Sequence, residues 1–184
     1  MSVKELFAVL LTLLFRNRKL WAELKESIPG KEFNVLREYA VPVIALVQLA
    51  KFPLIGTPRP AMFFAVTSFL VDVAALYLVG GGVLYLLARE RSESFKAVIL
   101  MVICYSMTPV WLGELFYFTG IWSCVFAILA MVHTIVTSRN GLVLVLDLEK
   151  AVFRSALRNI ALVIAVITSL VFLLMTAAMR LFNI

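Results

Sequence analysis

Two acidic residues stand inside apolar stretches of this chain, where an ionisable group has few structural uses. Asp72 lies near the middle of the apolar run Ala61–Ala88, and Glu114 lies in the latter half of the run Ala97–Phe118. A charged side chain at the centre of a bilayer costs about 2.5–3.5 kcal/mol on insertion scales. Asp72 is therefore interpreted either as a proton or ion site or as a buried group hydrogen-bonded to a neighbouring helix.

Small residues accompany Asp72 at heptad spacing and predict which way it faces. Such a stripe is where another helix packs closely, so Asp72 is expected to face a helix bundle and not lipid, with no second acid evident at its depth. The three glycines at 80–82, in the same apolar run, also permit close backbone approach or a bend. The stripe comprises Ala65, Ser68, Asp72, Ala75, Val79 and Gly82.

Lys51 is the natural partner for Glu114. It lies near the end of a weaker apolar run, Leu36–Ile55, from which its long side chain can also snorkel to headgroups. A structural ion pair between Lys51 and Glu114 is one prediction, and half of a substrate pathway is the sharper alternative.

The only histidine, His133, lies beside a second stripe of small residues and has no companion ligand. It is expected to be a packed, hydrogen-bonded imidazole and not a metal ligand. Cys104 and Cys124 lie in apolar runs and are interpreted as small hydrophobic residues. No nucleophile motif, phosphate-binding loop or metal-ligand spacing is present, so the sequence predicts a protein that is not an enzyme and uses no cofactor or metal.

The composition of the chain indicates which structural elements hold these residues in place. The 184 residues are 63% hydrophobic and 15% charged, with mean hydropathy +1.03; soluble domains have roughly 45–50% and about 25%. The excess apolar area must face lipid. The sequence predicts an all-α integral membrane protein, a five-transmembrane-helix bundle over 35–184, with spans at roughly 36–56, 61–88, 96–118, 121–138 and 157–180.

Basic residues give the expected orientation. Five spans place fourteen of the 17 Lys and Arg residues on one side, leaving only Lys51, Arg59 and Arg180 on the other. Because positive loops stay inside, we predict a multi-pass protein of the cytoplasmic membrane with its N-terminus in the cytoplasm and its C-terminus outside. The basic residues separate apolar runs instead of forming one patch, so we expect anionic lipids and the lipid bilayer as partners, and no nucleic acid.

Residues 1–34 form a cytoplasmic amphipathic segment in this interpretation. An interfacial amphipathic helix would place Trp21 at headgroup depth and Arg16, Arg18 and Lys19 on lipid phosphates. The alternative is a helix packed over the cytoplasmic ends of the spans. The short apolar segment Gly141–Leu148 is interpreted either as another interfacial helix or as a lead-in to the last span, with Asp147 as its N-cap.

Two tyrosine–proline motifs complete the pattern. One runs from Glu38 and Tyr39 to Pro42 at the start of the first span, and the other from Tyr105 to Pro109 within the third. Pro109 removes a helix hydrogen bond in mid-membrane, which is tolerated where hydroxyl groups or neighbouring helices satisfy the freed carbonyl, and Ser106 and Thr108 lie nearby. The alternative is a simple kink.

These motifs, taken in order, resemble the Yip family, named for Ypt/Rab-interacting proteins, in its short prokaryotic form. The resemblance implies a five-span bundle with a cytosolic N-terminus; eukaryotic members are associated with vesicle traffic, Rab partners and membrane shaping. The residues that carry it are Leu14, Phe15 and Trp21, then Tyr39 and Pro42, the glycines of the second span, Ser94 and Phe95, and Tyr105 with Pro109.

Two functions fit the sequence. The first is a non-enzymatic membrane protein that organises the bilayer or a protein partner through its basic cytoplasmic face. The alternative is a small transporter or an ion or proton channel that uses Asp72 and Glu114 between the proline-interrupted first and third spans. The small-residue stripes also allow a homodimer, although they serve packing within one chain equally well.

Overall fold

The computed structural model describes residues 3–27, 34–87, 92–146 and 154–181 of the chain, and over these ranges it contains helices and no strand. Five helical segments are long and apolar enough to cross a membrane, which confirms the predicted number. They are Leu36–Ile55, Pro58–Leu87, Glu93–Phe116, Trp122–Val145 and Arg154–Leu181.

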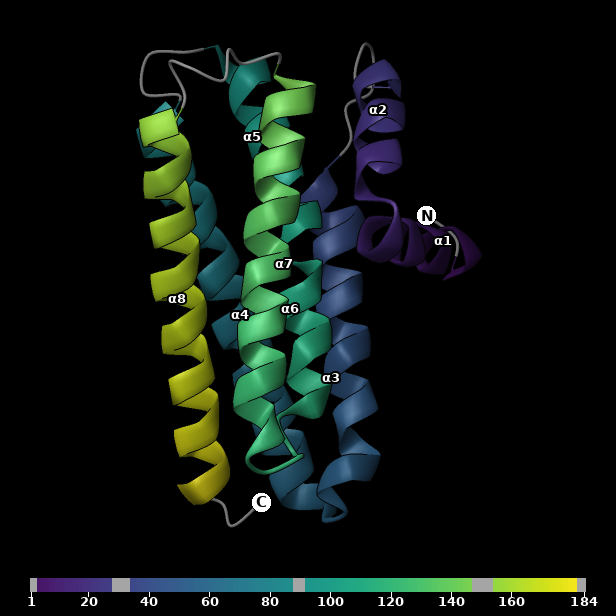
Figure 1. Cartoon of the computed structure of the whole chain (residues 1–184). Coiled ribbons are helices and arrows are strands. Elements are labelled where there is room, and N and C mark those ends of the chain that lie inside the picture. The colour runs from purple at the N-terminus through teal and green to yellow at the C-terminus, as the bar shows by residue number, and fades with distance from the viewer. Residues whose placement is uncertain (1–2, 28–33, 88–91, 147–153, 182–184) are drawn as a thin grey trace.

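These segments form an antiparallel bundle, and the third segment lies at its centre. In an apolar 18-residue stretch of the third segment 67% of the residues are buried, against 39% or less in the corresponding stretches of the other four. The third segment consists of α5 (Glu93–Ser106), α6 (Thr108–Gly113) and one 3-10 turn (Glu114–Phe116). It contacts α3 (Val41–Ile55), α4 (Pro58–Leu87) and α7 (Trp122–Val145), and α8 (Arg154–Leu181) packs against α4 and α7 (Figure 1).

The two ends of the bundle differ in charge. The end where α4 and α7 finish and α5 and α8 begin carries nine described Lys and Arg residues, not counting Lys4 near the N-terminus, and we refer to it as the basic end. At the far end, Arg59 and Arg180 are the exposed basic residues of the described part of the chain. The basic end comprises Arg16, Arg18, Lys19, Lys25, Arg37, Lys96, Arg139, Arg154 and Arg158.

Two short helices precede the bundle at this end. α1 (Val3–Phe15) lies at one side of the bundle, roughly perpendicular to its axis, and α2 (Asn17–Ser27) turns to lie parallel to the bundle and contacts α7 (Figure 1). Both are part of the main hydrophobic core, to which they contribute Leu13, Leu20 and Trp21. α1 also exposes an apolar side, comprising Phe7, Leu11 and Phe15, which suits contact with lipid.

Trp21 therefore does not occupy the predicted headgroup position. Its side chain is fully buried and packs edge-on against Tyr105 of α5, with ring centroids 6.3 Å apart. It also covers Gly141 of α7, where a Cβ atom would lie 2.9 Å from the indole ring. The structure thus favours the alternative for α2, a helix packed against the ends of the spans, because its one large aromatic residue fits where α7 has no side chain.

The fourth span is longer than predicted. Residues Gly141–Val145 continue α7 without a break, so they are neither a separate interfacial helix nor a lead-in to the last span. The prediction ended the span near residue 138 because Arg139 and Asn140 interrupt the apolar run, but a helix continues through polar residues where it leaves the hydrocarbon region. Asp147, the predicted N-cap, lies outside the described residues.

The prolines produce the two irregular helical turns. A π-helical turn, Leu36–Ala40, closes when Val41 N–H donates to Leu36 O, immediately before Pro42. The helix of the third span breaks at Met107, and Pro109 falls in the first turn of α6, where its missing N–H costs little.

Candidate functional site

Four polar side chains meet inside the bundle between α3, α4 and the 3-10 turn of the third span. They are Gln48, Lys51, Asp72 and Glu114, which we call the polar cluster. None is more than 4% exposed, and Lys51 and Glu114 are 0% exposed. Apolar spans rarely enclose this many polar groups, because each must find a partner away from water.

Gln48 joins the two acids. Its amide Nε2 donates to Asp72 Oδ2 at 2.8 Å and to Glu114 Oε2 at 3.3 Å. Lys51 Nζ donates to the Gln48 carbonyl at 2.8 Å and forms an ion pair with Glu114 Oε2. The Lys51 ammonium also lies 5.5 Å from the centre of the Phe64 ring, within range of a cation–π contact.

The predicted ion pair between Lys51 and Glu114 is thus confirmed. The suggestion that Lys51 snorkels to the headgroups is wrong, because its side chain folds inward to the carboxylate. The statement that Asp72 has no acid at its depth is also wrong, since Glu114 shares a donor with it. Asp72 does face the bundle, as its stripe of small residues predicted.

Sequence reasoning missed Gln48, which it treated only as an interruption of an apolar run. Gln48 and Lys51 are three residues apart and lie on the same face of α3, the spacing that brings two helical side chains together. Two polar residues at that spacing in an apolar span are a signal that could have placed both in one cluster.

The cluster has an uneven set of charges. One ammonium faces two carboxyl groups, so full ionisation would leave a net charge of −1 at a site with no exposed member. One carboxylate oxygen, Glu114 Oε1, is buried without a hydrogen-bond partner among the described residues. A proton or a monovalent cation would neutralise this charge, and burial of an uncompensated charge is costly.

The two tyrosine–proline motifs contact each other at a second site, apart from the polar cluster. Tyr39 and Thr108 share a hydrogen bond of 2.7 Å between their hydroxyl groups. The Tyr39 ring packs on Tyr105 with centroids 4.2 Å apart. Tyr39 precedes Gln48 by nine residues, about 13 Å along a helix, so the motifs and the polar cluster form separate sites.

In the second motif the nearby hydroxyl groups do not replace the helix hydrogen bond that Pro109 removes, which favours the simple kink. The Thr108 hydroxyl bonds Tyr39, and the Ser106 hydroxyl is buried with no partner among the described residues. Neither satisfies the carbonyl freed by Pro109. The break at Met107 makes a substitute hydrogen bond for this carbonyl less necessary, because the chain leaves the regular helix there.

His133 lies partly buried on α7, apart from the other candidate residues. Its Nε2 is buried and lacks a hydrogen-bond partner within the described parts of the chain, so the predicted hydrogen bond is missing at this nitrogen. Among the residues that the structure describes, no group of three or more His, Cys, Asp or Glu side chains could hold a metal ion. The predicted headgroup residues Arg16, Arg18 and Lys19 are exposed at the basic end.

Comparison with protein-family models, with curated proteins and with solved structures gives no match for this chain. Its function must therefore be inferred from the arrangement of its own residues.

Proposed function

We propose that this chain is a non-enzymatic, multi-pass protein of the cytoplasmic membrane that organises the bilayer, or a protein partner at its surface, through its basic end. In this proposal the basic end faces the cytoplasm and the far end lies outside. The observation that carries it is the juxtaposition of cationic and lipid-facing groups on α1 and α2. Phe7, Leu11 and Phe15 are exposed beside the exposed Arg16 and Lys19.

Physical chemistry supports this arrangement as a membrane-surface contact. Apolar side chains enter the boundary between headgroups and acyl chains, and neighbouring basic residues bind anionic phosphates. Because α1 and α2 are held by the core, the contact is rigidly attached to the spans. We also propose that the chain belongs to the Yip family. The packing of Tyr39 on Tyr105 supports this assignment, because it brings together two of the motifs on which the resemblance depends.

The test uses exposed residues, since deleting α1 and α2 would uncover the core around Gly141. Full-length protein in neutral-lipid nanodiscs is titrated with vesicles containing phosphatidylglycerol. Arg16→Gln/Lys19→Gln should weaken binding by about tenfold to thirtyfold, because each basic residue near an anionic surface contributes roughly 1 kcal/mol.

A matched control removes the same charge from the far end. Arg59→Gln/Arg180→Gln should leave vesicle binding unchanged, because these residues face the opposite side. Equal losses in both variants, or no loss in either, would refute the proposal.

A second function is favoured by the polar cluster. We propose as the alternative that its unbalanced charge serves proton or cation passage, with Asp72 and Glu114 as the exchanging groups. Proteoliposomes with an internal pH dye would show flux that Asp72→Asn abolishes. If wild-type protein gives no proton or sodium flux above empty liposomes, the cluster is a structural lock between α3, α4 and the third span.

A further inference from the structure

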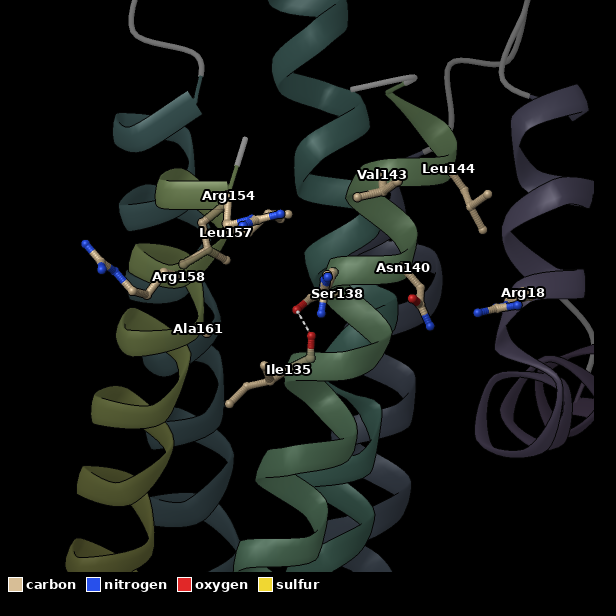
Figure 2. Close-up of a pocket in the computed structure, with 12 residues that line it drawn as sticks. Arg18, Ile135, Ser138, Asn140, Val143, Leu144, Arg154, Leu157, Arg158 and Ala161 are labelled. Carbon is tan, nitrogen blue, oxygen red and sulfur yellow. Dashed lines mark hydrogen bonds between the residues drawn. The ribbon is translucent and has the colours of Figure 1, made fainter. Parts of the chain in front are cut away.

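A cavity of about 900 Å³ opens at the basic end between α7 and α8, and Arg18 reaches it from α2. Four arginines line it, together with the polar side chains of Ser138 and Asn140, and no acidic residue of the described part of the chain does. In Figure 2 the Arg154 side chain points from α8 toward α7 and Arg18 points toward Asn140, whereas the Arg158 side chain points outward from α8, away from α7. The four arginines are Arg18, Arg139, Arg154 and Arg158.

The described residues provide no acidic partner for these guanidinium groups. Within the described residues, none of the four forms an ion pair or a hydrogen bond with a carboxylate. Helical spacing explains how they come together: Arg154 and Arg158 are one turn apart on α8, and Arg139 shares a face of α7 with Ile135 and Val143. Four positive charges around one cavity, with no carboxylate partner in the described ranges, are suited to an anion that carries more than one charge.

The lining residues are suited to binding phosphate groups. Guanidinium groups bind phosphate oxygens in pairs of parallel hydrogen bonds, and the Ser138 hydroxyl and the Asn140 amide can donate further bonds. A volume of about 900 Å³ lies within the usual range of ligand pockets, roughly 300–1,000 Å³, so it accommodates a headgroup with two phosphates.

A second cavity lies along the same pair of helices. This cavity, of about 270 Å³, lies farther from the basic end and is lined mainly by apolar residues, among them Ile128, Met131 and Phe172. Ser169 of α8 borders it, with its Oγ 3.9 Å from Met131 Sδ of α7. The α7–α8 pair thus borders an arginine-lined cavity at the basic end and a separate apolar cavity farther along.

The spacing of the two cavities fits an acyl chain. Arg139 and Ile128 are eleven residues apart on α7, as are Arg158 and Ser169 on α8, and each separation is about 16 Å along a helix. Half of the hydrocarbon core is about 15 Å thick. A lipid whose phosphates lie among the arginines would therefore place the end of an acyl chain in the apolar cavity.

We infer that the two cavities along α7 and α8 together form a binding site for an anionic phospholipid with two phosphates, with its headgroup among the four arginines and an acyl chain that reaches the apolar cavity. This inference rests on the proposed function in one respect, because the basic end must face an anionic leaflet. It adds a defined lipid site to the general surface contact made by α1 and α2. Basic pockets between spanning helices bind such headgroups in other membrane proteins.

Native mass spectrometry of the full chain in a neutral detergent tests the site. The probes are cardiolipin, phosphatidylglycerol and phosphatidylcholine. Wild-type protein should bind cardiolipin most tightly and phosphatidylcholine least. Arg139→Gln/Arg154→Gln should weaken cardiolipin binding by about tenfold or more, because two charge-assisted contacts are lost.

The surface variant Arg16→Gln/Lys19→Gln is the matched control, since it removes the same charge outside the cavity. Its cardiolipin affinity should equal that of wild-type protein even where its binding to vesicles is weakened. Equal losses in the two variants, or an unchanged affinity of the cavity variant, would overturn the site. If the surface variant instead bound anionic vesicles as tightly as wild-type protein, the proposed function would be refuted, but the cardiolipin result for the cavity would stand.

Two further measurements separate a lipid from a soluble polyanion. Ser169→Trp fills the apolar cavity and should weaken cardiolipin binding while leaving pyrophosphate binding unchanged. Pyrophosphate should bind wild-type protein at least about tenfold more weakly than cardiolipin, because it has no apolar chain to bury. Equal affinity for the two, or an unaffected Ser169→Trp variant, would overturn the lipid assignment.

Discussion

Replacing Lys51 by methionine tests the energetics of the polar cluster. Methionine keeps the length and apolar stem of lysine, so the substitution removes the charge and leaves little cavity. It also removes the hydrogen bond to Gln48 and the ion pair with Glu114. Both carboxyl groups then lie in the bundle without a cation, since the described residues offer no other basic group in contact with the cluster.

The expected cost follows from the burial. Lys51 and Glu114 are 0% exposed, so solvent cannot screen the uncompensated charge. Breaking a buried pair from one side costs about 3–5 kcal/mol. In the double variant Lys51→Met/Glu114→Gln both charges of the pair are gone, and the remaining cost should be about 1–2 kcal/mol for the unmade hydrogen bonds. The second substitution should therefore restore stability.

Unfolding in mixed detergent micelles, followed by tryptophan fluorescence, measures these free energies. Trp111 is buried three residues before Glu114 and reports on the region of the cluster. Lys19→Met is the control: its pair with Glu23, 3.6 Å apart, is exposed and should contribute less than about 1 kcal/mol. A double variant as unstable as Lys51→Met, or a single variant within 1 kcal/mol of wild-type protein, would refute the reasoning.

Other predictions concern packing at the basic end. Gly141→Ala should destabilise the protein by about 1–3 kcal/mol and shift the emission of Trp21, because the new Cβ would meet the indole ring at 2.9 Å; Gly81→Ala, where nothing lies within 4 Å, should be neutral or stabilising by up to about 1 kcal/mol. Tyr39→Phe should cost about 1 kcal/mol through the lost bond to Thr108, whereas Tyr77→Phe, at an exposed position, should cost nothing measurable in the same unfolding assay. Destabilisation by Gly81→Ala equal to that by Gly141→Ala, or equal effects of the two tyrosine changes, would contradict these contacts.

The helical architecture was largely predictable from the length of the apolar runs, because a segment that is to cross a lipid bilayer has few structural options. Each apolar run of sufficient length forms a helix, since every backbone group must be satisfied within its own segment. The stripe around Asp72 also indicated the buried face of α4 correctly, because small residues mark where a second helix approaches. Gly80 and Gly82 fit this rule: added Cβ atoms there would lie 3.0 Å from Leu100 and Val163.

The errors arose where tertiary packing decided between two local possibilities. Trp21 suits a headgroup layer as well as it suits a protein core, and only the absence of a side chain at Gly141 determines which one it occupies. Lys51 can equally reach headgroups or an internal acid; the position of Glu114 on another span selects the acid. The role of Gln48 as a bridge depends on the relative rotation of three helices, which no single segment encodes.

Topology mapping of the full chain tests the central claim most directly. A fluorescent protein or an alkaline phosphatase is fused to each end in turn, and the activity of the two reporters in the cytoplasm and outside is compared. Five crossings, with the basic end in the cytoplasm, predict fluorescence only for the N-terminal fusion and phosphatase activity only for the C-terminal fusion. Both ends in the same compartment would contradict the five-span arrangement, and with it the lipid contacts inferred for the basic end.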